Sequence, residues 1–460
     1  LAHDPDDRLA RAALALVLRS NGRNEDAWRE MRAALASSRP QAAVHISHGA
    51  LLSRERRWEE AAEAFRRAIA LDPLLGEASV QLAVCLAAMG RIDEARDLMQ
   101  SSEPGLDPPA LAKLAGLYAE FGESAKCIEL AERAIAANPY LVDARRTLAV
   151  ELLRTGRFEP GWREHVFRPT RGAEVVEQAL RGQYPPALPS ELRGREVTIL
   201  AEQGLGDMLF FLRFAKPLAD AGARLRLIGL DPRLEPLLAR AIDVEALPGR
   251  EIAADALAVW AGDLPLFVRP LIGSEPCPSL RIAPLPERLE RMRERLGPGA
   301  RPRVAFAWQA GVAAGTPGAR PDSLFKEISA ARLGELLAGL PFDFVSVQRH
   351  ATSEAMRDLQ QALGARLVDC GDVNADLEDM LALLSLMDDY VGVSSTNVHL
   401  IAAVGHRARI LVPYPRDWRW QGHGESVWYP GFATYRQAVG GDWSAALARL
   451  REDLAGARGP

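Results

Sequence analysis

The stretch that decides the fold is ILAEQGLGDMLFFLRFA, residues 199–215. It continues an apolar run that begins at Val197, which predicts a buried β-strand. Gly204 and Gly206 then permit a tight turn, and the apolar residues after Asp207 follow the spacing of a helix. A strand, a glycine turn and a helix in this order are typical of an α/β unit built on a parallel sheet.

Asp207 has two interpretations. In the first turn of a helix its carboxylate is stabilised by the helix dipole, so it can simply cap the helix. At the rim of a cleft the same carboxylate can serve as a general base. The turn is not a dinucleotide fingerprint, because Leu209 stands where GxGxxG requires its third glycine.

Strands and helices alternate from about residue 190 onward. One series of expected strands is EVTILA, RLRLIGL and ALAVW. A Pro- and Arg-rich segment at residues 281–304 separates it from a second series, RPRVAFAW, FDFVSVQ, RLVDCG, DDYVGVS and ARILVPY. We expect two Rossmann-like halves with parallel sheets, and a ligand in the cleft at the carboxyl ends of their strands.

A second strand–turn–helix site is DDYVGVSSTNVHLIAA, residues 388–403. Its strand ends near Val393 and its helix carries His399. Between them stand four small polar residues, Ser394, Ser395, Thr396 and Asn397. Such side chains and the free N–H groups of a helix N-terminus predict a phosphate cradle. Ordinary capping by one of the serines is the alternative, with the histidine as a core residue.

The first third of the chain, residues 1–168, is rich in Ala and Leu and gives no strand signal. The segments AAEAFRRAIALDP and CIELAERAIAANP place Pro73 and Pro139 66 residues apart, which is two periods of 33. This period resembles that of the tetratricopeptide repeat (TPR), about 34 residues. Alanines around Phe65 let paired helices approach closely. We expect an α-solenoid whose concave face binds a peptide or protein, and a non-repeating helical bundle is the alternative.

The bulk composition excludes several classes of protein. The 460 residues carry a net charge of −5, which gives no support for a nucleic-acid or acidic-membrane partner. Four scattered cysteines without CxxC or metal spacing are typical of reduced thiols in a cytosolic protein. No apolar run reaches the roughly 18 residues that a membrane span needs. No signal peptide is visible, and because the chain begins at Leu1 without Met, we expect native residues to precede it.

Several motifs together resemble the bacterial TPR-containing glycosyltransferases, which are similar to ADP-heptose heptosyltransferases and more distantly to O-GlcNAc transferases. The motifs are AEQGLGD, AFAWQAG, FVSVQ, VSSTNVHLIAA, VPYPRDWRW and VWYPGFATYRQ, after GRFEPGWREHVFR at the end of the repeats. The resemblance implies a TPR domain at residues 1–168 followed by a GT-B fold. In that fold, residues 169–295 would form an acceptor-side Rossmann-like domain and residues 296–460 a nucleotide-sugar-side one.

The resemblance also implies an activity and site residues. A cytoplasmic enzyme would move a sugar from a nucleotide-sugar donor to a protein acceptor, flagellin or another surface protein, held by the TPR region. Asp207 matches the acid proposed as catalytic base. The implied donor-binding residues are Gly204, Gly206, Trp308, Gln309, Gly311, Lys326, Gln348, Ser394, Ser395, Thr396, Asn397 and His399. The implied cleft residues are Trp418, Arg419 and Trp420, for which core packing is the alternative.

Two departures from the family pattern bear on activity. Ser394-Ser395 stands where the family usually has Asp-Thr, which indicates either a different donor or lost activity. Lys326-Glu327 replaces the usual Arg-Ser, although Lys326 still brings a positive charge to a diphosphate.

No acid-rich DxD follows a strand, because the one such motif is Asp4-Pro5-Asp6 in the helical region. We therefore expect that no metal is required, and no other cofactor either. The resemblance implies inverting transfer by direct displacement at the anomeric carbon. The competing hypothesis is a TPR interaction scaffold with a degenerate, non-catalytic GT-B domain.

Overall fold

The structure of the chain is a computed structural model. It describes residues 7–36, 40–73, 75–168, 172–202, 204–247, 256–273, 277–311, 326–413, 417–420, 424–438 and 441–456. The Asp4-Pro5-Asp6 motif lies outside these residues. The chain divides into two compact units, Leu1–Leu148 and Ala149–Pro460.

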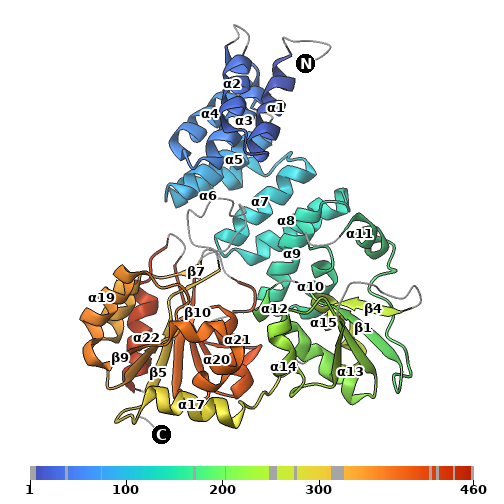
Figure 1. The fold of residues 1–460 in the computed structure, drawn as a ribbon. Coiled ribbons are helices and arrows are strands. Elements are labelled where there is room, and N and C mark those ends of the chain that lie inside the picture. The colour runs from blue at the N-terminus through green and yellow to red at the C-terminus, as the bar shows by residue number, and fades with distance from the viewer. Residues whose placement is uncertain are drawn as a thin grey trace. The chain divides into compact units, whose positions relative to one another are not determined.

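Within its described residues, the first unit has helices as its only regular structure. They are α1 (Arg8–Ser20), α2 (Asn24–Leu35), α3 (Ala42–Arg54), α4 (Trp58–Leu71), α5 (Gly76–Ala88), α6 (Ile92–Ser102), α7 (Pro108–Glu120), α8 (Ser124–Ala137) and the beginning of α9 (Val142–Arg154). Successive helices pack as pairs, α3 on α4, α5 on α6 and α7 on α8 (Figure 1). The predicted solenoid of helical repeats is confirmed.

Small residues explain how closely the helices of one pair approach. Phe65 on α4 is fully buried, and so are Ala61 and Ala68 on either side of it. Gly49 on α3 faces the ring of Phe65, and a Cβ at Gly49 would lie 2.7 Å from that ring. The pair therefore closes around one large side chain because its neighbours are small.

The second unit begins with the end of α9, contains α10 (Phe158–His165) and α11 (Ala173–Leu180), and continues into a four-stranded sheet. The strand order is β3-β2-β1-β4, and every neighbouring pair is parallel. The strands are β1 (Glu196–Leu200), β2 (Arg224–Ile228), β3 (Val244–Leu247) and β4 (Leu257–Trp260). The helical segments are α12 (Leu205–Phe211), η1 (Leu212–Ala215), α13 (Lys216–Asp220), η2 (Pro232–Leu234), α14 (Glu235–Leu238), η3 (Ala261–Asp263), α15 (Leu264–Phe267) and α16 (Arg269–Ile272). We call this part the first α/β half.

A seven-stranded sheet forms the second α/β half, with strand order β12-β13-β11-β10-β5-β8-β9. All its neighbours are parallel except the antiparallel pair β12–β13. The strands are β5 (Arg303–Ala307), β8 (Asp343–Ser346), β9 (Leu367–Asp369), β10 (Asp389–Val393), β11 (Ala408–Val412), β12 (Gly424–Ser426) and β13 (Tyr429–Arg436), besides the separate antiparallel pair β6 (Gln309–Ala310) and β7 (Lys326–Glu327). The two sheets are separate, so the predicted pair of Rossmann-like halves is confirmed.

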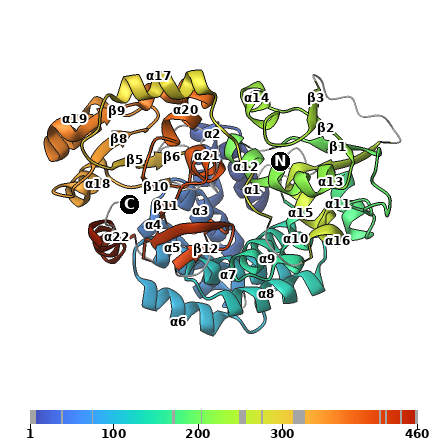
Figure 2. The same ribbon diagram turned by 90° about the horizontal axis from the view of Figure 1, so that it is seen from below.

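Helices complete the second half. They are α17 (Pro286–Leu296), α18 (Ala330–Leu337), α19 (Ser353–Leu363), η4 (Gly364–Arg366), η5 (Gly371–Ala375), α20 (Leu377–Leu384), α21 (Thr396–Val404) and α22 (Ser444–Gly456). Figure 2 shows α17, which lies within the Pro- and Arg-rich segment expected between the two series, running beside α20. No helix of the described residues is long and apolar enough to cross a bilayer.

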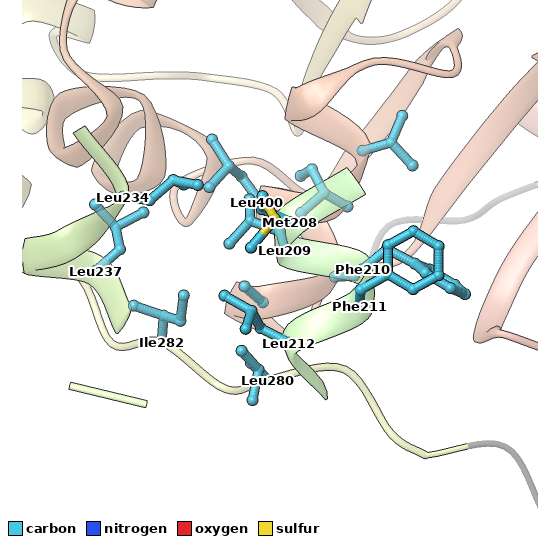
Figure 3. Close-up of a cluster of buried hydrophobic side chains, with 14 of the residues drawn as sticks. Met208, Leu209, Phe210, Phe211, Leu212, Leu234, Leu237, Leu280, Ile282 and Leu400 are labelled. Carbon is cyan, nitrogen blue, oxygen red and sulfur yellow. The ribbon is translucent and has the colours of Figure 1, made fainter. Parts of the chain in front are cut away.

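The two halves meet through α12 and α21. Residues 208–212 share one buried cluster with Leu400 of α21 and with Leu280 and Ile282 (Figure 3). The first turn of α12 lies just as close, because a Cβ at Gly206 would be 2.8 Å from Cδ2 of His399. The second glycine of the opening motif is therefore needed for the contact between the halves.

Replacing Gly206 with Ala tests this contact. The added Cβ would meet the ring of His399, which is buried and whose Nδ1 lies 2.5 Å from the Tyr429 hydroxyl, so the ring cannot turn away without losing that contact. We expect Gly206→Ala to lower the free energy of unfolding in urea by about 1–3 kcal/mol.

The matched control is Gly116→Ala in α7, where a Cβ would meet nothing within 4 Å. It is expected to raise the free energy of unfolding by about 0.5–1 kcal/mol, the usual gain of Ala over Gly inside a helix. A Gly206→Ala protein as stable as the wild type would contradict the close packing of α12 on α21.

Candidate functional site

A cavity of about 1090 Å³ opens between the two α/β halves. Residues 204–207, which follow β1, line it from the first half. Residues that follow β5, β8 and β10 line it from the second half. The cavity thus lies at the carboxyl ends of parallel strands, where open α/β sheets bind their ligands, and it is of the size of small-molecule sites.

Most of the site residues expected from the sequence come together here. Those that line the cavity are Gly204, Gly206, Asp207, Gln309, Gly311, Lys326, Gln348, Ser394, Ser395, Thr396, Asn397, His399 and Arg419. Three aromatic residues are not among the lining residues and are buried instead, Trp308, Trp418 and Trp420. Trp418 packs edge-on against Trp162 of α10, with ring centroids 5.2 Å apart. The packing alternative fits Trp418 and Trp420, and Trp308, which was expected at the donor, is buried as well.

The first turn of α21 has no side-chain cap. Ser395 is the N-cap residue, but its side chain makes no capping hydrogen bond. The hydroxyl of Ser394 is also engaged elsewhere, since it lies 3.5 Å from Nζ of Lys326. Thr396 and Asn397, which begin the helix, both line the cavity. Capping by a serine is therefore not seen, and an uncapped helix start of this kind favours an anion.

Arg419 is the centre of a chain of charges at the cavity wall. Its guanidinium pairs with Oδ1 of Asp207 from the first half. It also lies 3.2 Å from Oδ1 of Asp417, whose Oδ2 is 3.3 Å from Nζ of Lys326. Arg419 is only 8% exposed and stacks 4.4 Å from the ring of Trp418. A cation this deeply buried needs the two carboxylates, because an unpaired buried charge is costly.

The nearby cations and burial both act on the pKa values of Asp417 and His399. The two effects oppose each other at Asp417 and act in the same direction at His399. Burial alone would raise the pKa of Asp417, but the positive charges of Arg419 and Lys326 outweigh it and hold that pKa well below its usual range. For His399, burial and the nearby cations act together and hold its pKa well below the usual range. Near neutral pH the first group is therefore a carboxylate and the second an uncharged imidazole.

Gln348 lines the cavity but uses its amide to hold the protein backbone. Its Oε1 accepts hydrogen bonds from the N–H groups of Trp308 and Gln309, each at 2.9 Å. Its Nε2 donates to the carbonyls of Gln309 at 3.1 Å and Arg349 at 2.9 Å. The side chain thus ties the end of β5 to the end of β8 and shapes the cavity wall.

Several lining residues were not expected from the sequence. They are Leu205, Arg233, Ala307, Ala310, Val347, Arg349, His350, Thr352, Asn374, Leu377 and Asp417. Asp417 could have been found, because it begins the DWRW motif. Arg349 directly follows Gln348, but Arg233 and Asn374 stand in segments without a motif. With them the wall carries four cationic side chains, Arg233, Lys326, Arg349 and Arg419, against the carboxylates of Asp207 and Asp417.

In the described part of the chain, no three His, Cys, Asp or Glu side chains converge as metal ligands would. The cavity therefore presents an uncapped helix start, an excess of cations and one carboxylate from the opposite half. This arrangement can hold an anionic group against the second half and accept a proton on the first.

Known proteins resemble different parts of this chain. Residues 52–104 match the tetratricopeptide repeat family, in agreement with the helix pairs of the first unit. Protein FlbA of Caulobacter vibrioides is 28% identical over an alignment of 338 residues. The alignment covers 68% of this chain and 54% of FlbA, so the chain spans about half the length of this curated relative.

Solved structures resemble the chain at low identity. The glycosyl transferase family 9 protein of Veillonella parvula aligns with a TM-score of 0.41 and 10% identity over 58% of this chain and 98% of its own. The E. coli ADP-heptose LPS heptosyltransferase II aligns with a TM-score of 0.39 and 14% identity, over 56% and 97%. The TPR protein TTC0263 of Thermus thermophilus aligns with a TM-score of 0.32 and 16% identity, over 38% and 99%.

The charge chain predicts how stability depends on pH. A carboxyl group whose pKa is lowered on folding stabilises the folded state above its unfolded pKa of about 3.9, and this contribution is lost as the pH falls toward the folded value. At neutral pH we expect Asp417→Asn to lower the free energy of unfolding by roughly 3 kcal/mol, because Arg419 and Lys326 lose a buried partner. Below about pH 4 the variant should lose less further stability than the wild type.

The matched control is Asp220→Asn, which breaks the exposed pair between Asp220 and Lys216 at 2.7 Å. It is expected to change the free energy of unfolding by less than about 0.5 kcal/mol. Urea titrations of all three proteins at several pH values measure both effects. Parallel acid branches for the wild type and Asp417→Asn would show that Asp417 does not carry this contribution.

Proposed function

We propose that this chain is a glycosyltransferase that takes a sugar from a nucleotide-sugar donor. The observation that carries the proposal is one cavity with an anion site on the second α/β half and a carboxylate on the first. A nucleotide-sugar has its phosphates and its reactive anomeric carbon within one molecule. A site for it needs cations and N–H groups at one end and a proton acceptor at the other.

The donor phosphates are assigned to the start of α21. Its first-turn N–H groups are uncapped, and Nζ of Lys326 lies 3.5 Å from the Ser394 hydroxyl at the same place. Arg349, which follows the end of β8 in the same half, is exposed and lines the same cavity. These groups would stabilise the negative charge that grows on the phosphate as the sugar leaves.

Asp207 is assigned as the general base. Its Oδ1 is paired with Arg419, and within the described residues its Oδ2 accepts a long hydrogen bond, 3.4 Å, from the N–H of Gly204. Oδ2 would take the proton of an acceptor hydroxyl as the hydroxyl oxygen forms its bond to the anomeric carbon. The bond from that carbon to the phosphate oxygen breaks from the other face, and its electron pair leaves with the nucleotide. The configuration at the anomeric carbon is thereby inverted, and no metal is required.

The acceptor is proposed to be a protein, for which a surface protein such as flagellin is the candidate, recruited by the helical repeats. Repeat stacks of this kind present surfaces that bind peptides and proteins. The four cysteines are buried and none forms a disulfide, which fits a reducing compartment such as the cytoplasm. Under this proposal the repeat domain ends near residue 168, and the two GT-B domains divide near residue 295.

A thermal-shift screen tests the donor side directly. UDP-, GDP-, ADP- and CMP-linked sugars are added to the full chain, and the correct donor is expected to raise the melting temperature, since a ligand at 100 times its Kd stabilises by about 2.7 kcal/mol. A TPR scaffold with a non-catalytic domain would be supported instead if no nucleotide-sugar stabilised the protein and no sugar was transferred in a lysate of its own organism.

Asp207→Asn separates catalysis from structure. Asparagine keeps the size of the side chain but cannot take a proton, so we expect transfer to fall by about 10²–10⁴-fold. Donor affinity, measured by calorimetry, should stay within about twofold, because the phosphate groups bind elsewhere. The matched control Asp220→Asn removes an acid of the same half that lies outside the cavity, and its transfer rate should be unchanged. Some loss of stability is expected in either case, because Arg419 loses one of its two carboxylate partners. Full turnover in a folded Asp207→Asn protein would therefore show that Asp207 has a structural role and is not the base.

A further inference from the structure

Arg213 is a buried cation that reaches from the first α/β half into the second. It belongs to η1 and is only 2% exposed. Its guanidinium donates hydrogen bonds to the carbonyls of Phe210 at 3.0 Å and Cys277 at 3.4 Å, and to that of Trp428 in the second half at 2.7 Å. Burying the charge of Arg213 is energetically unfavourable, which suggests that this arginine has a specific role.

The guanidinium of Arg213 also lies between two rings. Its central carbon is 4.5 Å from the ring centroid of Phe210 and 4.5 Å from that of Tyr429, which begins β13. The hydroxyl of Tyr429 in turn lies 2.5 Å from Nδ1 of His399 in the cavity wall. Arg213, Tyr429 and His399 therefore form a continuous path from the first half to the candidate donor site.

The direction of the hydrogen bond decides where His399 carries its proton. Burial raises the pKa of Tyr429 to about 12, so the phenol keeps its proton and can donate. The cations Arg213 and Arg419 lie close to that phenol and attract its oxygen lone pairs, which makes the oxygen a poor acceptor and the hydroxyl a stronger donor. Tyr429 then donates to Nδ1. Because the imidazole is uncharged and has one proton, that proton must sit on Nε2.

Nε2 is the ring nitrogen next to the opening motif. A Cβ at Gly206 would lie 3.0 Å from it, and both Gly206 and His399 line the cavity. Tyr429 holds the other nitrogen, so Nε2–H remains for a ligand. An uncharged N–H donor of this kind stabilises an oxyanion without having to lose its own charge during the reaction.

We propose that Arg213 and Tyr429 are positioning residues that hold His399 as the Nε2–H tautomer, so that Nε2 donates a hydrogen bond to a phosphate oxygen of the ligand. The role of the phosphate rests on the proposed function. The tautomer itself rests only on the contacts of these three residues. Because Arg213 belongs to the first half, the donor site on the second half is complete only while α12 and α21 are packed together.

Nitrogen NMR of the histidine rings tests the tautomer in the full chain. The protein is labelled with ¹⁵N in histidine, and the His399 signals are assigned by their loss in His399→Asn. In the wild type we expect a protonated Nε2 and an unprotonated Nδ1. In Tyr429→Phe, which keeps the ring and removes the hydroxyl, we expect a shift toward the Nδ1–H tautomer. A wild-type Nδ1–H tautomer, or an unchanged spectrum in Tyr429→Phe, would overturn the proposal.

Tyr435→Phe is the matched control. Tyr435 lies on the same strand and is equally buried, but its hydroxyl donates to Asp453 at 2.6 Å and does not contact His399. Its spectrum should show His399 as in the wild type. Arg213→Lys should retain the Nε2–H tautomer because it retains the charge, and Arg213→Met should lose it. A tautomer that persists in a folded Arg213→Met protein would show that Arg213 only fills space.

A binding experiment connects the tautomer to the ligand. With inorganic pyrophosphate as the probe, calorimetry should show affinity lowered by about fivefold in Tyr429→Phe, the usual net value of one hydrogen bond, and unchanged in Tyr435→Phe. Equal affinity in the wild type and Tyr429→Phe would overturn the ligand role of Nε2. The NMR readout does not depend on turnover. A failed transfer assay would therefore count against the proposed function alone, and a wrong tautomer against this proposal alone.

Discussion

The buried guanidinium of Arg419 is the interaction on which the candidate site depends. Only 8% of this residue is exposed, and its charge is met by Asp207 from one α/β half and Asp417 from the other. The aromatic rings of Trp418 and Phe210, 4.4 and 5.2 Å from the guanidinium carbon, add cation–π contacts. Arg419 thus fixes the positions of the proposed base Asp207 and of Asp417, and it connects the two α/β halves.

A cavity for an anion and a base has to satisfy opposed electrostatic requirements. Cations and helix N–H groups attract phosphate, whereas a free carboxylate repels it. The second half meets the first requirement with Lys326 and the start of α21. The first half supplies Asp207, whose charge is partly met by Arg419. Placing the groups on different halves lets both exist at one cavity, at the cost of a site that exists only when the halves are packed.

Close backbone packing at Gly206 connects this electrostatic arrangement to the fold. The glycine motif predicts a place where something approaches the main chain, and the sequence suggested that this would be the ligand. In the structure His399 makes that approach, with Cδ2 2.8 Å from where a Cβ would stand. The histidine expected at the phosphate loop is therefore also a packing residue. The two alternatives considered for His399 were a core residue and a ligand contact. They are compatible, because His399 is buried between the halves and also lines the cavity.

The sequence by itself determined the helical repeats, the two parallel sheets and the strand ends where the cavity lies. These follow from local periodicity, glycine turns and the spacing of small residues, which act between neighbours in the chain. Only the tertiary structure decided that Trp418 and Trp420 are buried while Arg419 between them reaches the cavity. It alone joined Asp207 to Arg419, 212 residues later, and Arg213 to Trp428, 215 residues later. Aromatic and charged residues look the same in a core and in a cleft, and their role is set by which distant surface covers them.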